Sequence, residues 1–185
     1  HTYWRYWGDA GDATKMEWEL PAGVTVGAIQ WPVPEKLEDE GIVTYIYNGT
    51  VLLLVPLKLG ADLPPGVLNI RGKVSWLECE KSCFPGEGKV EAVLNIGTVV
   101  KSSASSQRIE LAKAALPKTD SSLKLQARWD APPDGKERSF LIEFEAEKLP
   151  ARLDFYPDGS SAVVIKGATD RLDLSANKVA LRKTA

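Results

Sequence analysis

The residues with the clearest potential for chemistry are Cys79 and Cys83, the only two cysteines among the 185 residues of the chain. They lie in the stretch "WLECEKSCFPGEG", residues 76–88. Two thiols at this spacing can exchange electrons by forming and breaking a disulfide, can close a structural bridge, or can supply part of a metal site. These three alternatives make different demands on the rest of the sequence.

The first alternative is an inert structural bridge in a scaffold module. A disulfide from Cys79 to Cys83 closes a short loop, for which the chain-entropy model gives roughly 2 kcal/mol of stabilisation, the low end of the usual range. A bridge that serves stability more naturally joins distant strands. A small loop at a hairpin tip is exposed and reducible, as labile and catalytic disulfides are.

The second alternative is a copper-binding module that uses the same two cysteines. A C-x3-C pair with a remote histidine can hold copper, and the single histidine of this chain is His1. Zinc would need two further ligands, for which only carboxylates remain. The lack of other histidines also argues against a Ser-His-Asp triad or a histidine-rich metal centre. We expect no metal and no cofactor beyond the thiols.

The third alternative, thiol-disulfide exchange, is the one we favour. Two thiols on a constrained tip can form and break a bridge without rearranging the core, which suits a shuttle that a partner's thiolate attacks. The neighbouring acids Glu78, Glu80 and Glu87 disfavour a thiolate, and only Lys81 and Lys89 oppose them. The pair is therefore predicted to receive and forward electrons rather than to act as a strong oxidant.

Strand patterns surround the cysteines and dominate the chain. Val67–Cys79 reads as one long strand, and Lys89–Ile96 returns on the other side of the pair. The cysteine stretch is thus predicted to be the tip between two antiparallel strands, bounded by Pro85, Gly86 and Gly88. Further strands are predicted over residues 15–20, 23–29, 123–130, 139–147, 151–157, 161–166, 170–175 and 178–183.

Two other local patterns are specific enough to predict structure. The dipeptide Asn48-Gly49 is typical of a tight turn and predicts a hairpin of Ile42–Tyr47 with Thr50–Leu57. Serines before an apolar run and a proline after it predict one short helix over residues 106–116.

The composition and the strand pattern together predict an all-β soluble protein. Short strands with frequent turns indicate a sandwich or barrel, and we expect two β-modules, residues 1–117 and a smaller one of residues 118–185. Apolar residues make up 44%, charged residues 26%, and the net charge is -2, so nucleic acid is not an expected partner. The longest apolar run, Val51–Leu57, is far shorter than the roughly 20 residues of a membrane helix.

Several segments, taken in order, resemble the N-terminal periplasmic domain of DsbD-type thiol:disulfide interchange proteins, and most closely the branch related to the copper-sensitivity suppressor ScsB. The final stretch also resembles the second β-module of that branch. The segments are "HTYWRYWGDAG" (1–11), "LPAGVTVGAIQWPVPE" (20–35), "VTYIYNGTVLLLVPL" (43–57), "VSWLECEKSCFPGEG" (74–88) and "DFYPDGSSAVVIKGATDRLDLSANKVALRK" (154–183).

The resemblance implies an immunoglobulin-like β-sandwich in the periplasm, ahead of a membrane-spanning electron conduit and a thioredoxin-like domain. It implies a thiol:disulfide oxidoreductase that takes electrons from the thioredoxin-like domain and reduces periplasmic disulfide-bearing proteins. Contact with the membrane would come only through an attached transmembrane portion. We also expect further chain before His1 in the native protein.

The resemblance also implies roles for individual residues. Cys83, which precedes Phe84-Pro85, would form the mixed disulfide with partners, and Cys79 would resolve it. The cysteines of the better-known DsbD pattern lie further apart, so this assignment departs from that pattern. Phe84 and Pro85 would support the site as neighbours.

The family further implies a cap loop that shields the cysteines with an aromatic ring. Trp31 is the first candidate for that ring and Tyr45 the second; the alternative for Trp31 is packing in the core or on a strand. Trp76 is expected to pack beneath the cysteine tip. Residues 1–4 are expected to form an edge or core strand rather than a site.

Overall fold

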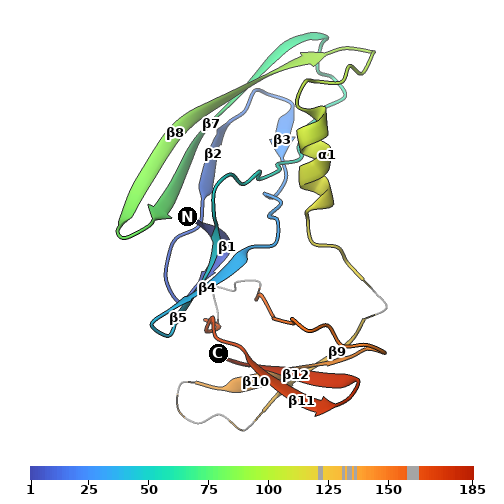
Figure 1. Ribbon diagram of the computed structural model, residues 1–185. Coiled ribbons are helices and arrows are strands. Elements are labelled where there is room, and N and C mark those ends of the chain that lie inside the picture. Colours follow the sequence, from blue (N-terminus) through green and yellow to red (C-terminus); the bar gives the residue numbers. More distant parts are fainter. Residues whose placement is uncertain (121–122, 131, 133–134, 136, 158–162) are drawn as a thin grey trace. The chain divides into compact units, whose positions relative to one another are not determined.

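The computed structural model describes residues 1–120, 123–130, 132, 135, 137–157 and 163–185 (Figure 1). Half of the described residues are in strands or bridges and 5% are in helix, which confirms the predicted all-β class, with an immunoglobulin-like fold and a second β-module. The strands are β1 Thr2–Gly8, β2 Lys15–Glu19, β3 Val24–Val26, β4 Glu35–Asp39, β5 Ile42–Tyr47, β6 Leu57–Leu59, β7 Gly66–Cys79, β8 Cys83–Ile96, β9 Lys124–Trp129, β10 Ser139–Glu145, β11 Asp170–Ser175 and β12 Lys178–Thr184, and the helix is α1, Ser106–Ala114.

The chain divides into two compact units that interleave along the sequence. Unit 1 comprises His1–Arg5, Asp12–Glu35 and Ile46–Pro117, and unit 2 comprises Tyr6–Gly11, Lys36–Tyr45 and Lys118–Ala185. Strands β1 and β5 therefore contribute residues to both units. The chain enters unit 2 for the last time after Pro117, which is where the sequence predicts the boundary between the modules. Two earlier segments, Tyr6–Gly11 and Lys36–Tyr45, also belong to unit 2. The module boundaries of 1–117 and 118–185 stay a prediction.

Unit 1 is built on a long antiparallel ribbon. Strands β7 and β8 pair without a register shift from Gly66 opposite Ile96 to Cys79 opposite Cys83, and β2 pairs with the other side of β7. The sheet order β2-β7-β8 leaves β8 at the edge, as Figure 1 shows. Because side chains alternate along a strand, Leu68 and Ile70 of β7 point together into a small core with Val24 of β3.

The structure confirms that the cysteines lie at the tip between two antiparallel strands. The returning strand starts earlier than predicted, at Cys83 rather than Lys89, so Pro85, Gly86 and Gly88 lie within β8 instead of bounding it. An edge strand tolerates a proline such as Pro85 because its outer side forms no ladder that needs the N–H. The predicted helix over residues 106–116 is confirmed as α1, Ser106–Ala114.

The predicted hairpin of Ile42–Tyr47 with Thr50–Leu57 is wrong. Strand β5 instead follows β4 through a two-residue turn at Glu40 and Gly41, whose φ angles of 49° and 83° are those of a mirror-image turn. Residues 50–56 form no strand beyond an isolated bridge, and β6, which follows them, pairs with β3. Pro56 explains part of this, because proline cannot donate a hydrogen bond to a ladder.

Unit 2 contains an antiparallel sheet of order β11-β12-β10-β9. Its most buried strand is β12, where Val179, Ala180 and Leu181 are at most 5% exposed. The strand expected over residues 151–157 is wrong, since the structure has no strand there. Of the strand expected over 161–166, residues 163–166 form none, and 161–162 lie outside the described residues.

Candidate redox site

The two cysteines form a disulfide that joins the end of β7 to the start of β8. Their Cα atoms lie 4.1 Å apart, and Cys79 and Cys83 are direct cross-strand partners. The two sulfurs are thus bonded, as both the exchange and the structural alternatives require.

The backbone around the disulfide shows that Cys79 and Cys83 form a non-hydrogen-bonded pair of the ladder. The N–H of Cys79 donates to the carbonyl of His1 at 2.9 Å, and the main-chain nitrogen of His1 donates to the carbonyl of Cys79 at 2.8 Å. The N–H of Glu80 donates to the carbonyl of Ser82 across the tip at 3.3 Å. In such a pair the backbone groups point away from the partner strand. The N–H and C=O of Cys83 therefore face the open side of β8.

The two halves of the disulfide differ in exposure. Cys79 is 6% exposed, whereas Cys83 is exposed and is followed by Phe84, which is 63% exposed. A hollow of about 350 Å³ opens beside the bond. Its lining residues are His1, Glu78, Cys79, Glu80, Lys81, Ser82 and Phe84. Cys83 is therefore the more solvent-exposed half of the disulfide, and Cys79 lines the hollow beside it.

Tyr3 of β1 places a hydroxyl group beside both sulfurs. The hydroxyl donates to Sγ of Cys79 at 3.1 Å and lies 3.9 Å from Sγ of Cys83. Tyr3 is 5% exposed, and this burial raises the pKa of its phenol, which keeps the group protonated and able to donate. A donor at this position favours the thiolate form of Cys79 once the disulfide opens. The ring of His1 meets the ring of Tyr3 edge-on, 5.3 Å between centroids.

Sequence reasoning assigned residues 1–4 to a strand and missed this contact. Residues 2–4 do lie in β1, but Tyr3 also touches the sulfurs. No local signal could have found it, because the contact spans 76 residues and depends on how β1 is placed beside the end of β7.

Trp76 lies on the ribbon before the disulfide, on the other face. Side chains alternate along β7, so Trp76 and Cys79 point in opposite directions. The indole ring covers Gly86, its direct cross-strand partner, where a Cβ would overlap the ring, and its Nε1–H donates to Glu78 at 3.2 Å. Trp76 thus supports the strands that hold the tip rather than lying beneath the sulfurs. Pro85 lies opposite Leu77, on the same face as Cys83.

The two cap-loop candidates lie elsewhere. Trp31 stacks on Tyr47, with ring centroids 6.4 Å apart, and the Tyr47 hydroxyl donates to the carbonyl of Pro32 at 2.7 Å. Tyr45 is completely buried in unit 2, where its hydroxyl contacts Lys183. Neither Trp31 nor Tyr45 is among the described residues that line the hollow. Their cap-loop role stays a prediction.

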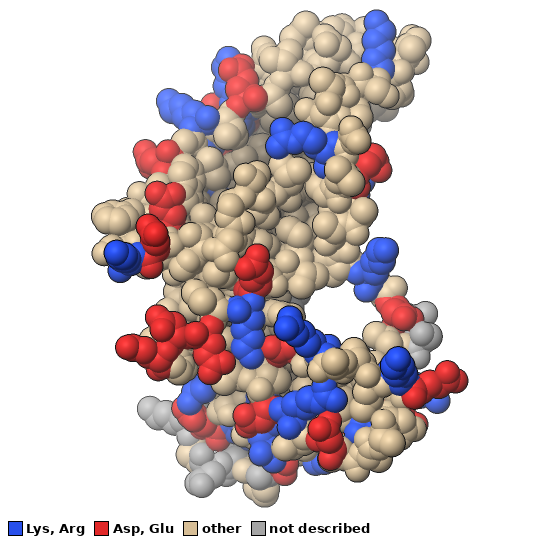
Figure 2. All heavy atoms as spheres, viewed as in Figure 1, with Lys and Arg blue, Asp and Glu red and all other residues tan. Residues whose placement is uncertain are grey.

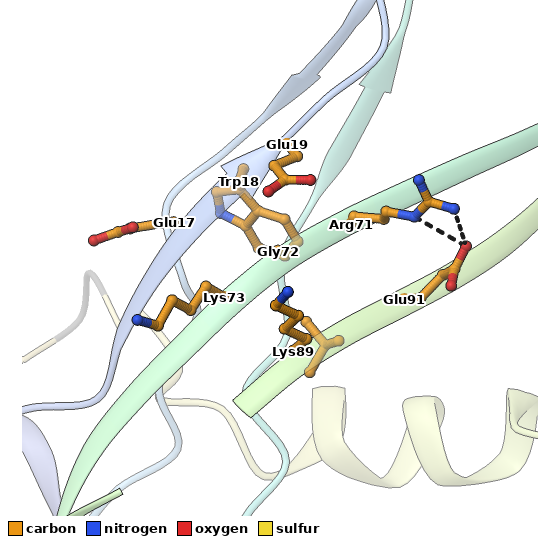
Figure 3. A pocket seen from close by; sticks show the side chains of 9 residues that line it. Glu17, Trp18, Glu19, Arg71, Gly72, Lys73, Lys89 and Glu91 are labelled. Atoms are coloured by element: carbon orange, nitrogen blue, oxygen red, sulfur yellow. Dashed lines mark hydrogen bonds and ion pairs between the residues drawn. The ribbon is translucent and has the colours of Figure 1, made fainter. Parts of the chain in front are cut away.

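The same ribbon carries a charged surface away from the sulfurs. A hollow of about 600 Å³ is lined by residues of β2, β7 and β8. Figure 3 shows its side chains, with Trp18 beside Gly72. Arg71 pairs with Glu91 at 3.1 Å, and a further ion pair joins Lys73 to Glu87. On the face shown in Figure 2, basic and acidic side chains are interspersed. This balance agrees with the small net charge.

Within the described residues, the His, Cys, Asp and Glu side chains form no group of three that could hold a metal ion. Among the described helices none is long and apolar enough to cross a membrane.

The fold and the site define a class of protein: a β-rich domain that carries a partly exposed disulfide at the tip of a hairpin. This arrangement is suited to thiol-disulfide interchange. Comparison with protein families agrees. Residues 1–95 match the family described as "Thiol:disulfide interchange protein DsbD, N-terminal". This match covers more than half of the chain and includes both cysteines and Tyr3, and the chain belongs to this family. Searches of the curated proteins and of the solved structures found no match.

Proposed function

We propose that this protein accepts electrons from a thioredoxin-like domain and passes them to disulfide-bearing partner proteins in the periplasm. The observation that carries the proposal is the asymmetry of the disulfide. An exposed Cys83 is bonded to a buried Cys79, and the sulfur of Cys79 accepts a hydrogen bond from Tyr3. Family membership supports both the chemistry and the periplasmic location.

Electron uptake begins on the oxidised pair. A thiolate of the donor attacks Sγ of Cys83, the bond to Cys79 breaks, and Cys79 leaves as a thiolate beside the Tyr3 hydroxyl. A second donor thiolate then attacks the donor's own sulfur in the mixed disulfide and releases Cys83. The donor dithiol has become a disulfide, and this protein has gained two electrons and two protons.

Electron delivery reverses these steps on a different partner. The Cys83 thiolate attacks a disulfide of the acceptor protein and forms a mixed disulfide, releasing one acceptor thiolate. The Cys79 thiolate then attacks Cys83, restores the original bond and frees the second acceptor thiol. No cofactor takes part. In the full-length protein, a transmembrane portion as in the ScsB branch would supply the electrons from the cytoplasm.

Single-cysteine variants test the proposal. Cys79→Ser keeps the exposed thiol of Cys83 and removes the resolving one, whereas Cys83→Ser does the opposite. The partner is a thioredoxin-fold protein whose second active-site cysteine is replaced by serine and whose remaining cysteine carries a thionitrobenzoate leaving group, so that it cannot resolve the adduct itself. After incubation with this partner, we expect Cys79→Ser to release thionitrobenzoate and accumulate a mixed disulfide, seen by non-reducing electrophoresis and mass spectrometry. Cys83→Ser should accumulate roughly tenfold less, because its remaining thiol is buried.

Two results would contradict the proposal. If neither variant captures the partner while a small disulfide reacts with both, the bridge does not serve exchange between proteins, and the inert structural alternative is favoured. If Cys83→Ser captures as much as Cys79→Ser, the assignment of Cys83 as the attacked sulfur is wrong.

A further inference from the structure

We propose that the open edge of β8 is the docking surface for the electron acceptor, and that an extended segment of the acceptor pairs with it as an added antiparallel strand. The acceptor's reactive cysteine would lie directly opposite Cys83. This inference rests on the proposed function and adds to it the conformation in which an acceptor is recognised. Adding a strand to an exposed sheet edge is a general mode of peptide recognition.

The first support is the direction of the backbone groups of β8. Because Cys79 and Cys83 form a non-hydrogen-bonded pair and the register is continuous, every second residue of β8 turns its N–H and C=O away from β7. These residues include Cys83, Glu87, Lys89 and Glu91. Among the described residues, no backbone hydrogen bond is made by their outward groups. Pro85 is another residue whose backbone turns away from β7, so its lack of an N–H removes no hydrogen bond between β7 and β8.

The second support is the length and exposure of this edge. Strand β8 has 14 residues, and Cys83, Phe84, Glu87, Lys89 and Glu91 on it are all exposed. Long uncovered edges invite pairing with other chains, and folded proteins commonly shorten or cover them. An open edge that begins at the attacked cysteine is continuous with the proposed exchange site.

The third support is the alignment of sulfurs that strand addition would produce. Direct partners in an antiparallel ladder point their side chains to the same face, and neighbouring strands lie roughly 4.8 Å apart. An acceptor cysteine opposite Cys83 would therefore lie on the far side of Cys83 from Cys79. The three sulfurs would form a row across three strands. Thiol-disulfide exchange requires attack along the axis of the bond that breaks, and this row supplies it.

The step that releases the acceptor needs no reactant other than the three sulfurs of this row. In the mixed disulfide, Cys83 is bonded to the acceptor cysteine. The Cys79 thiolate attacks Sγ of Cys83, the Cys79–Cys83 bond forms, and the acceptor sulfur leaves as a thiolate on the opposite side. In the oxidised protein the Tyr3 hydroxyl lies 3.1 Å from Sγ of Cys79, which is the attacking sulfur in this step.

The charged side chains along this edge would favour an acidic residue at one position of the acceptor segment. Glu87, Lys89 and Glu91 share the face of Cys83, and Glu87 and Glu91 are already paired with Lys73 and Arg71 of β7. Lys89 forms no ion pair among the described residues. An acidic side chain on the added strand opposite Lys89, six residues before its cysteine, would complement it.

Amide hydrogen exchange by NMR tests the pairing directly. The Cys79→Ser variant is joined through Cys83 either to a short extended peptide with that acidic residue or to glutathione, which is too short to form a strand. We expect the outward N–H groups of Cys83, Glu87 and Lys89 to exchange at least about tenfold more slowly in the peptide adduct. The N–H groups of Phe84 and Gly86, which face β7, should be protected in both adducts. Equal exchange of the outward groups in the two adducts would overturn the inference.

A pair of variants tests the same edge by rate. Glu87→Pro removes one outward N–H, and Glu87→Ala loses the same side chain but keeps the N–H. We expect the reduced Glu87→Pro protein to reduce a disulfide of the peptide about three- to tenfold more slowly than Glu87→Ala, as loss of one hydrogen bond implies. Both variants should reduce glutathione disulfide equally.

The outcomes separate the two proposals. If the wild-type protein reduces neither disulfide, the proposed function fails, and the docking surface fails with it. If it reduces both while the two variants behave alike and the outward amides stay unprotected, exchange stands and strand addition is overturned.

Discussion

The hydroxyl of Tyr3 lies 3.1 Å from Sγ of Cys79, the sulfur that leaves when a thiolate attacks Cys83. Burial raises the pKa of this phenol, so it remains a donor at neutral pH. A hydrogen bond to a charged acceptor is worth roughly 1.5–3 kcal/mol. Tyr3 therefore offsets part of the cost that burial and the neighbouring Glu78 and Glu80 impose on a Cys79 thiolate.

Replacing Tyr3 by Phe should raise the pKa of the Cys79 thiol. In a Cys83→Ser background, we expect an increase of about 1–2 pH units, because one pKa unit corresponds to about 1.4 kcal/mol. The ultraviolet absorbance of the thiolate, followed against pH, measures this. Tyr47→Phe is the matched control, since its hydroxyl donates to the carbonyl of Pro32. An unchanged pKa in Tyr3→Phe would show that the hydroxyl only fills space.

At this scale the sequence reveals the residues that react but not those that assist them. Cys79 and Cys83 could be selected because their type and spacing permit few chemistries. Tyr3 could not, because β1 holds four aromatic residues in two adjacent pairs, Tyr3-Trp4 and Tyr6-Trp7, and nothing in their order indicates which one meets a sulfur. Trp31 was selected as the shielding ring for its residue type; it stacks on Tyr47, and its cap-loop role stays a prediction.

The β7–β8 ribbon is the element that presents the disulfide, and close packing across it fixes the tip. Trp76 lies over Gly86, its direct partner on β8. The indole ring occupies the space that any larger residue at position 86 would need.

Gly86→Ala should therefore destabilise the ribbon. Overpacking of this kind costs roughly 1–3 kcal/mol. Gly88→Ala is the matched control, because a Cβ there would meet Val74 at an ordinary contact distance of 3.8 Å. Urea unfolding followed by tryptophan fluorescence compares the two variants. Equal stabilities would mean that Trp76 does not fill that space in solution.

Element patterns in the sequence were informative where they were long. The two strands around the cysteines could be predicted from their length and alternation, whereas the turn residues misled in one place. Asn48-Gly49 has the stronger hairpin signature, yet the tight turn between two strands is Glu40-Gly41. A non-glycine residue such as Glu40 can adopt a positive φ when pairing of the flanking strands offsets its cost, which local propensity does not report.

At the scale of the whole molecule, the feature that governs the response to pH is a buried polar network in unit 2. Lys183 is 2% exposed, and its Nζ donates to the Tyr45 hydroxyl at 2.8 Å and to the carbonyl of Gly167 at 2.7 Å. Burial lowers the pKa of Lys183 to about 8, with Lys36 adding to the effect and Asp154 and Asp9 opposing it. The network ties the segment before β11 to the sheet.

Stability should consequently rise with pH as Lys183 loses its proton. Between the folded pKa of about 8 and the unfolded value of about 10.4, the unfolded chain binds the extra proton, so deprotonation favours the folded state. We expect a gain of about 1–2 kcal/mol in the free energy of unfolding between about pH 8 and about pH 9.5. Above this range the buried tyrosines, whose pKa values are raised, act in the opposite direction.

The Lys183→Met variant provides the control for this prediction. Its free energy of unfolding is measured by urea titration at each pH. Whatever its absolute value, this free energy should change much less between about pH 8 and about pH 9.5 than that of the wild-type protein. A slope equal to that of the wild-type protein would contradict the assignment of the pH effect to Lys183.

The overall class of the protein was accessible from the sequence, because alternating short strands and turn residues recur throughout it. The interleaving of the two units was not. Segments 6–11 and 36–45 belong with the C-terminal part of the chain, and such long-range pairing leaves no mark on local composition.

The central claim is that the Cys79–Cys83 bond opens and recloses in service. Its reduction potential, measured by equilibrating the protein with glutathione or thioredoxin buffers and counting free thiols, tests this most directly. A relay must exchange with such couples, so we predict a value above about -300 mV. A value well below about -300 mV, in the range of structural disulfides, would contradict the account.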